Sequence, residues 1–217
     1  MTRIDYQAIV EKIRRLAYEF EDYLFEKRYW LEIGGVIPNE ELVAENQLSL
    51  EHATAYHAVW CRNLRELFLE AKKTEIPFDA FVDIGAGKGK ACFYAHLKMP
   101  ALTILGVEFS GPLVKVANRN KQRFNSSRVG FINADANEYL LPDSTKLVFM
   151  FNPFDNVVLE RFLANNADHF RQRRSVISYA NCIHRMSLSR LGFETIFRNP
   201  TRHISLCQLG RTGATGH

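Results

Sequence analysis

From Phe78 onward, short apolar runs alternate with amphipathic segments, and this alternation limits the folds that the chain can adopt. Seven runs rich in β-branched and aromatic residues are expected to be strands: 80–85, 103–109, 129–134, 146–152, 175–180, 193–198 and 203–209. Helical segments are expected between the first five, at 88–98, 111–124, 137–141 and 155–171. Apolar strands separated by helices are typical of a parallel sheet that is covered on both faces.

The last two expected strands break this rhythm, because only the turn NPTR, residues 199–202, separates them. A parallel crossover needs about a dozen residues or more, so this pair is expected to be an antiparallel hairpin. The sequence therefore predicts an α/β fold with a doubly wound, mainly parallel seven-stranded sheet that carries one antiparallel strand.

The residues before this pattern are expected to form a helical extension. Apolar residues recur there every three or four positions, at Ile9, Ile13, Leu16, Phe20, Tyr23 and Leu24. Ser49 is expected to cap a second helix whose apolar stripe contains Ala53, Tyr56, Trp60, Leu64, Leu67 and Ala71. We therefore divide the chain into an N-terminal helical extension or cap, residues 1–75, and a domain, residues 76–210.

The composition is that of an ordinary globular protein, with 47% hydrophobic and 24% charged residues among 217. No apolar run approaches the roughly 18 residues of a membrane-spanning helix, and the charged N-terminus does not resemble a secretion signal. Four cysteines lie far apart without a CxxC pair, which indicates reduced thiols in a cytoplasmic protein rather than a disulfide framework or a zinc site.

The segment VDIGAGKGKA, residues 82–91, places three glycines at alternate positions just after the first expected strand. Ligands bind at the carboxyl ends of strands in doubly wound sheets. A phosphate-binding P-loop would need glycine at Val82 or Ile84 and a Ser or Thr after the lysine, so it is excluded. A dinucleotide fingerprint would put Lys90 where close packing requires a very small residue, which leaves a nucleotide-dependent oxidoreductase as a weak alternative.

The pattern that the loop does match is D-x-G-x-G-x-G, through Asp83, Gly85, Gly87 and Gly89. Here the chain resembles the class I S-adenosylmethionine-dependent methyltransferases. In that family the glycines let the backbone pass close to the methionine and ribose parts of the cofactor, and Ala86 lies among these cofactor-binding residues. The alternative is a glycine-rich connector that binds no ligand.

Two later acidic residues extend the resemblance. The family has an acid at the end of the second strand whose carboxylate accepts hydrogen bonds from both ribose hydroxyls; Glu108 matches it, and Phe109 follows in position to pack on adenine. An Asp at the end of the third strand often receives the adenine amino group, which Asp135 beside Ala136 matches, with a helix cap as the alternative role. The resemblance covers residues 78–209 and implies S-adenosyl-L-methionine as cofactor and a strand order of 3-2-1-4-5-7-6, with strand 7 antiparallel.

The segment FMFNPFD, residues 149–155, lies where the family places residues that face the methyl acceptor. Members that methylate amino or amide groups carry [DNS]-P-P-[YFW] there, and Asn152, Pro153 and Phe154 resemble a shortened form without the second proline. These three are the candidate catalytic residues, and Asn152 is also a candidate cofactor contact. The structural alternative is that Asn152 ends a strand, Pro153 begins a turn and Asp155 caps the next helix; both interpretations can hold together.

The resemblance thus implies a methyltransferase that N-methylates an amino or amide group of a protein, a small molecule or RNA. The alternative is a catalytically inactive cofactor-binding module with a regulatory or scaffold role. No metal and no membrane partner are expected, and the acceptor and the oligomeric state stay open. It also stays open whether the cofactor or the acceptor contacts His52, Tyr56, His57 or Lys88. Tyr56 is interpreted as a core residue. Lys90 is expected to face solvent or to pair with an acid.

Overall fold

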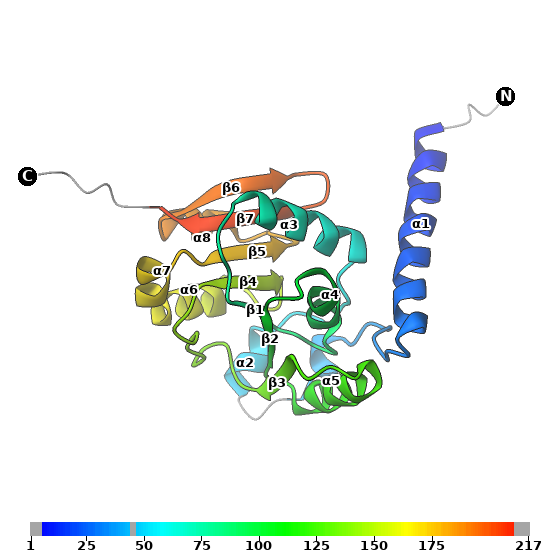
Figure 1. Cartoon of the computed structure of the whole chain (residues 1–217), viewed down its shortest axis with the longest axis horizontal. Helices are drawn as coiled ribbons and strands as arrows, with labels where there is room; N and C mark the ends of the chain where they lie inside the picture. Colours follow the sequence, from blue (N-terminus) through cyan, green and yellow to red (C-terminus); the bar gives the residue numbers. More distant parts are fainter. Residues whose placement is uncertain (1–5, 44–46, 211–217) are drawn as a thin grey trace, which may run out of the picture.

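A computed structural model describes residues 6–43 and 47–210, and its centre is a seven-stranded sheet in the order β3-β2-β1-β4-β5-β7-β6 (Figure 1). The strands are Ala80–Ile84 (β1), Thr103–Glu108 (β2), Val129–Asn133 (β3), Lys146–Phe151 (β4), Val176–Ala180 (β5), Phe193–Asn199 (β6) and Ile204–Leu209 (β7). Strands β1 to β5 pair in parallel, and β7 is antiparallel to both β5 and β6. The predicted fold class and strand order are confirmed.

Helices cover both faces of the sheet. They are Tyr6–Arg28 (α1), Gln47–Glu51 (α2), Cys61–Lys73 (α3), Lys90–Lys98 (α4), Gly111–Phe124 (α5), Asn156–Asn165 (α6), Ala167–Gln172 (α7) and Arg185–Arg190 (α8), with a 3-10 turn at Asn39–Glu41 (η1). Successive strand residues point to opposite faces, so Phe81 joins the core under α3 and α4, while Val82 joins the core under α6, α7 and α8. None of the described helices combines the length and the apolarity needed to cross a membrane.

The helix expected at 137–141 is wrong, because this segment forms a turn. Side chains bind its backbone groups, which a helix would otherwise pair internally. Asp135 accepts a hydrogen bond from the Asn137 amide at 2.9 Å, and Asn166 contacts the Leu141 amide and the Tyr139 carbonyl at 2.7 and 2.9 Å. Helix α8, between β5 and β6, was not predicted.

The expected second helix is wrong over residues 52–60. Helix α2 ends at Glu51 and α3 begins at Cys61, and two isolated antiparallel bridges, Ile37–Tyr56 and Ala53–Phe154, hold the intervening chain. The backbone of residues 52–54 bonds to the segment after β4 instead of to itself: the Asp155 amide donates to the His52 carbonyl at 3.0 Å. We call residues 52–57 the strap.

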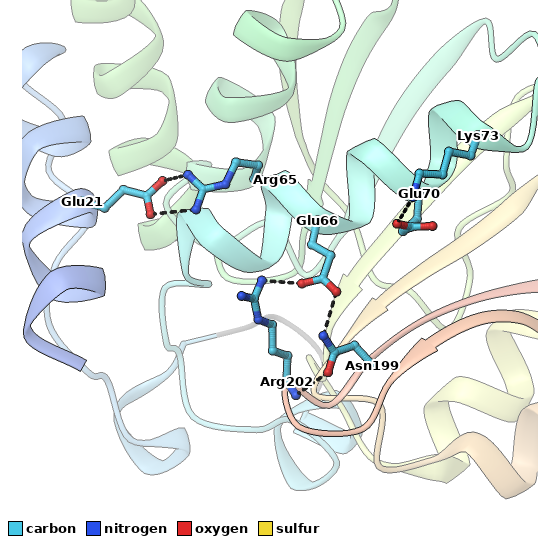
Figure 2. A network of polar contacts seen from close by, with 7 residues as sticks. All are labelled: Glu21, Arg65, Glu66, Glu70, Lys73, Asn199 and Arg202. Carbon is cyan, nitrogen blue, oxygen red and sulfur yellow. Dashed lines mark hydrogen bonds and ion pairs between the residues drawn. The ribbon is translucent and has the colours of Figure 1, made fainter. Parts of the chain in front are cut away.

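Helix α3 joins the N-terminal helix to the sheet. Its Arg65 pairs with Glu21 of α1 at 2.5 Å, as Figure 2 shows. Its Glu66 binds Asn199 at 2.7 Å and also pairs with Arg202, both at the turn between β6 and β7. The buried face of α3 carries Leu64, Leu67, Phe68 and Ala71, and these side chains share a core with the sheet.

Candidate functional site

A pocket of about 420 Å³ opens at the carboxyl edge of the sheet. The central strands end level there, since Ile84 of β1 lies beside Val107 of β2 and Met150 of β4. Eight of the residues predicted for the site line this pocket: Gly85, Glu108, Phe109, Asp135, Ala136, Asn152, Pro153 and Phe154. The other predicted residues, Asp83, Ala86, Gly87 and Gly89, do not line it.

The glycine loop after β1 needs glycine for two separate reasons. Gly85 and Gly87 have φ values of +79° and +55°, a left-handed conformation that glycine adopts without steric cost. Neighbouring side chains also leave no room for a Cβ atom, which would lie 2.2 Å from Pro153 Cβ at Gly85 and 2.4 Å from Tyr56 Cε2 at Gly87. The loop is therefore packed between the segment after β4 and the strap.

Glu108 ends β2 with its carboxylate buried at the pocket wall, where the residue is 4% exposed. Its Oε2 accepts a hydrogen bond from the Gly87 amide at 2.8 Å, and its Oε1 accepts one from the Ser110 amide at 2.9 Å. Burial raises the pKa of this carboxyl to about 6, against the opposing effect of the Ser110, Gly87 and Phe109 amides. One residue thus connects the ends of β1 and β2 and presents a carboxylate to the pocket.

Asp83 lies within β1, 2% exposed, beneath the loop rather than in the pocket. Burial raises its pKa to about 8; a hydrogen bond from Cys92 Sγ at 3.7 Å acts in the opposite direction, and the nearby Glu108 raises the pKa further. Its position indicates a neutral, buried carboxyl near neutral pH that supports the loop from below.

Asp135 follows β3 and holds helix α2 against the pocket. Its carboxylate accepts a hydrogen bond from the Ser49 hydroxyl and another from the Asn137 amide. No helix begins after Asp135 in the described chain before β4, so the helix-cap interpretation is wrong. Ser49, which lies inside α2 rather than at its cap, also lines the pocket.

The segment after β4 is held by the strap and by β5. Asn152 has a φ of +44°, its Oδ1 accepts a hydrogen bond from the Tyr179 hydroxyl at 3.3 Å, and its carbonyl accepts one from the Thr54 hydroxyl at 2.6 Å. The Thr54 amide donates to the Pro153 carbonyl at 3.2 Å. The side-chain oxygen of Asn152 and the carbonyl oxygens of Asn152 and Pro153 therefore each accept a hydrogen bond from within the chain.

Asp155 caps α6, as the sequence predicted, by accepting hydrogen bonds from the Val157 and Val158 amides. Its other oxygen lies 2.7 Å from His52 Nδ1, which ties the strap to the start of α6. Burial alone would raise the pKa of Asp155, but the hydrogen bonds from His52 and the two amides outweigh it and lower the pKa.

The sequence left contacts of His52, Tyr56 and His57 with cofactor or acceptor open, but it did not indicate the non-helical strap that carries them. The strap residues Ala53, Thr54, Ala55, Tyr56 and His57 all line the pocket. The interpretation of Tyr56 as a residue of a helical core stripe is wrong: its ring lies on Gly87, and its hydroxyl donates to the Ile33 carbonyl at 2.9 Å. The partners of His52 and Thr54, Asp155 and Asn152, lie about a hundred positions away in sequence, so no local pattern indicates them.

The two lysines of the loop point away from the pocket. Lys88 donates from Nζ to the Gly34 carbonyl at 2.8 Å, and its ammonium lies 5.0 Å from the centre of the Tyr56 ring. Lys90 is 4% exposed and pairs with Asp22 at 3.1 Å and Glu26 at 3.3 Å, which confirms the expected pairing with an acid. Lys90 therefore joins the glycine loop to α1.

Within residues 6–43 and 47–210, no three His, Cys, Asp or Glu side chains lie close enough together to hold a metal ion. The four cysteines are all free.

The family profile described as a methyltransferase domain matches residues 79–198, more than half of the chain. The chain therefore belongs to the class I S-adenosylmethionine-dependent methyltransferase family. No sequence among curated proteins matches it.

Solved structures share the fold at low sequence identity. TrmN from Thermus thermophilus is 13% identical with a TM-score of 0.53, over 70% of this chain and 49% of its own. Human N-acetylserotonin methyltransferase, in complex with S-adenosylmethionine, is 15% identical with a TM-score of 0.52, over 68% and 52%. A methyltransferase from Aquifex aeolicus is 11% identical with a TM-score of 0.51, over 70% and 100%. The chain spans about half the length of the first two.

Proposed function

We propose that the protein is an S-adenosylmethionine-dependent methyltransferase that binds its cofactor in the pocket at the ends of β1, β2 and β3. The observation that carries this proposal is the buried carboxylate of Glu108, which faces the pocket beside the left-handed glycine loop. A carboxylate has about four acceptor sites, and the Gly87 and Ser110 amides use two of them. The remaining acceptor capacity suits hydroxyl donors such as the vicinal pair of a ribose.

The remaining predicted contacts fit the same cofactor. Phe109 and Ala136 supply apolar surface to the pocket that would take adenine, and Asp135 supplies a carboxylate acceptor for its amino group. The glycine loop would take the methionine portion. The cofactor, when bound, supplies an electrophilic methyl group; the chain's own task is to align an acceptor with it, and such alignment can lower a barrier by several kcal/mol.

The acceptor side is proposed to lie between the segment after β4 and the strap. Asn152, Pro153 and Phe154 form one wall there, and Asn181 and His57 contribute further polar groups to the pocket lining. A carbonyl oxygen has two lone pairs, so the Asn152 carbonyl can accept a second hydrogen bond beside that of Thr54. This favours an amino or amide nitrogen as the methyl acceptor, with Thr54 and Tyr179 holding Asn152 in place.

A second candidate function is a cofactor-binding module without catalysis. The bonds from Thr54 and Tyr179 to Asn152 favour it, because each already occupies one acceptor site of an Asn152 oxygen and leaves less capacity for an incoming amino group. Phe154 is 6% exposed, so it offers little open surface for stacking against a planar acceptor.

One experiment separates the two. The protein is incubated with methyl-labelled S-adenosylmethionine and cell extract, and the protein, RNA and small-molecule fractions are counted. A methyltransferase labels one fraction, and Asn152→Ala loses that label at a cofactor concentration that saturates the variant. Cofactor binding without label in any fraction favours the non-catalytic module, and absence of cofactor binding overturns both.

A further inference from the structure

Helix α1 carries an apolar row that the described part of the chain leaves exposed. Eight large apolar side chains along it are 45–74% exposed: Tyr6, Ile9, Val10, Ile13, Leu16, Phe20, Tyr23 and Leu24. We call them the α1 stripe. Single exposed apolar residues are ordinary, but a contiguous row of this size marks an interaction surface.

The opposite face of α1 packs against the body of the protein, as we call the sheet and its covering helices. The Asp22 carboxylate accepts a hydrogen bond from the Cys61 amide at 2.8 Å, and the Arg62 guanidinium lies 3.5 Å from the centre of the Tyr18 ring. Phe25 packs against the core. At 3.6 residues per turn these residues lie on the other side of the helix from the α1 stripe, so the stripe is not the surface by which α1 attaches to α3. Figure 1 shows α1 standing at the edge of the molecule.

The spacing of the α1 stripe is that of a coiled coil. Six of its members are separated alternately by three and four positions: Tyr6, Ile9, Ile13, Leu16, Phe20 and Tyr23. This is the a/d pattern by which two helices interdigitate. Val10 and Leu24 lie beside this seam and widen it.

We propose that α1 pairs with α1 of a second copy of this chain as an antiparallel coiled coil. In that orientation an a position of one helix meets a d position of the other. With the twofold axis between positions 14 and 15, Ile13 meets Leu16 of the second copy, Ile9 meets Phe20, and Tyr6 meets Tyr23. All six seam residues then have an apolar partner.

Charge favours the antiparallel orientation. Lys12 and Glu19 flank the seam at equivalent g positions, and g positions face one another in an antiparallel pair. Lys12 therefore faces Glu19 of the second copy, and the twofold axis repeats the pair. Glu19 also binds Arg15 of its own helix at 2.9 Å. A parallel pair would place Lys12 beside Ala17 and Glu19 beside Leu24, without a charge partner. Interfacial membrane helices instead carry a polar face rich in Lys and Arg, whereas here acidic and basic residues alternate.

The exposed area of the α1 stripe and the place where the body attaches to α1 are also consistent with this dimer. Aromatic side chains present about 150–250 Å² each when free, and the aliphatic ones somewhat less; at the exposure observed, the stripe offers on the order of 800 Å² per helix, the share of one partner in a standard interface. The body attaches to the C-terminal half of α1, on the face away from the stripe. Antiparallel pairing thus puts the two bodies at opposite ends of the coiled coil.

Sedimentation equilibrium of the full chain tests the proposal. We expect a species of twice the chain mass, and a monomer for Ile13→Glu/Leu16→Glu, with the dissociation constant raised at least about a hundredfold because charges enter an apolar seam. The matched control is Leu140→Glu, at an exposed leucine outside α1, which should leave the dimer intact. Circular dichroism and thermal unfolding of each variant at low concentration check that the fold is retained.

Charge exchange tests the orientation. Lys12→Glu should raise the dissociation constant roughly fivefold to tenfold by creating two like-charge pairs, and Lys12→Glu/Glu19→Lys should restore it. A wild-type chain that stays monomeric at all concentrations, or a dimer that survives Ile13→Glu/Leu16→Glu, overturns the proposal. Failure of the double exchange to restore pairing overturns the antiparallel arrangement. None of these three outcomes bears on cofactor binding.

Discussion

Replacing Glu108 by glutamine should weaken cofactor binding while leaving stability nearly unchanged. Burial raises the pKa of Glu108 from 4.5 to about 6, so its ionised form costs the folded protein about 2 kcal/mol above pH 6 and nothing below pH 4.5. Glutamine removes this cost. It also has one acceptor oxygen in place of two, which leaves either the Gly87 or the Ser110 amide without its partner at a cost of about 1–3 kcal/mol. The two effects have opposite signs and similar size.

Cofactor affinity has no such compensation. Hydrogen bonds to a charged acceptor contribute about 1.5–3 kcal/mol each, and the glutamine at position 108 can keep at most one of the two proposed ribose contacts. Glu108→Gln should therefore bind S-adenosylhomocysteine about ten- to a hundredfold more weakly at pH 7.5. Calorimetry measures the affinity and urea unfolding the stability, with Glu194→Gln, at an exposed position of β6, as the control.

Two results would refute this reasoning. Unchanged affinity in a folded Glu108→Gln protein would show that Glu108 does not bind the ribose. A stability loss of more than about 3 kcal/mol would show that the two amide bonds outweigh the cost of burying the charge. For the wild type, affinity should also fall below pH 6, as Glu108 becomes protonated.

Three further substitutions test the contacts that hold the glycine loop in place. Gly87→Ala forces a Cβ against the Tyr56 ring at a φ of +55°, so urea unfolding should show a loss of at least about 1–2 kcal/mol; wild-type stability would contradict the packing described. The raised pKa of Asp83, about 8, means that the folded state holds a proton that the unfolded state releases, so stability should fall by up to about 1.4 kcal/mol per pH unit between pH 6.5 and 7.5. Asp83→Asn should reduce this pH dependence of the stability, and an unchanged pH dependence would show that another group causes it. Lys90→Met leaves the carboxylates of Asp22 and Glu26 without their cation. Thermal unfolding should report a stability loss of about 3 kcal/mol. An unchanged midpoint of thermal unfolding would show that these ion pairs do not contribute to stability.

The sheet could be predicted because its signals are local. Buried parallel strands read as apolar runs, and the four residues between β6 and β7 left no alternative to a hairpin. The sequence also predicted which edge of the sheet carries Glu108 and Asp135, because both residues come at the end of an expected strand. The class of the protein and the strand ends that form one side of its pocket could therefore be predicted from the sequence.

The strap could not be predicted for the opposite reason. The apolar spacing of Ala53, Tyr56 and Trp60 suits a helix, but Thr54 and His52 find their partners near Asn152 and Asp155, and those long-range bonds override local propensity. Periodicity located α1 correctly but did not indicate that its stripe would lie exposed.

Direct contacts of the predicted residues with cofactor, and a location in the cytoplasm, stay predictions. Asp83 shows why a motif match alone does not assign a contact: it matches the family pattern yet lies beneath the loop, outside the pocket. The cofactor contacts are best tested together at the pocket itself.

Calorimetric titration of the purified, folded protein with S-adenosylmethionine tests the central claim most directly. The account predicts saturable binding of one cofactor per chain with a dissociation constant in the micromolar range, because the pocket, the glycine loop and the Glu108 carboxylate are already formed. Absence of binding by a protein whose circular dichroism and unfolding transition are those of a folded domain would contradict it.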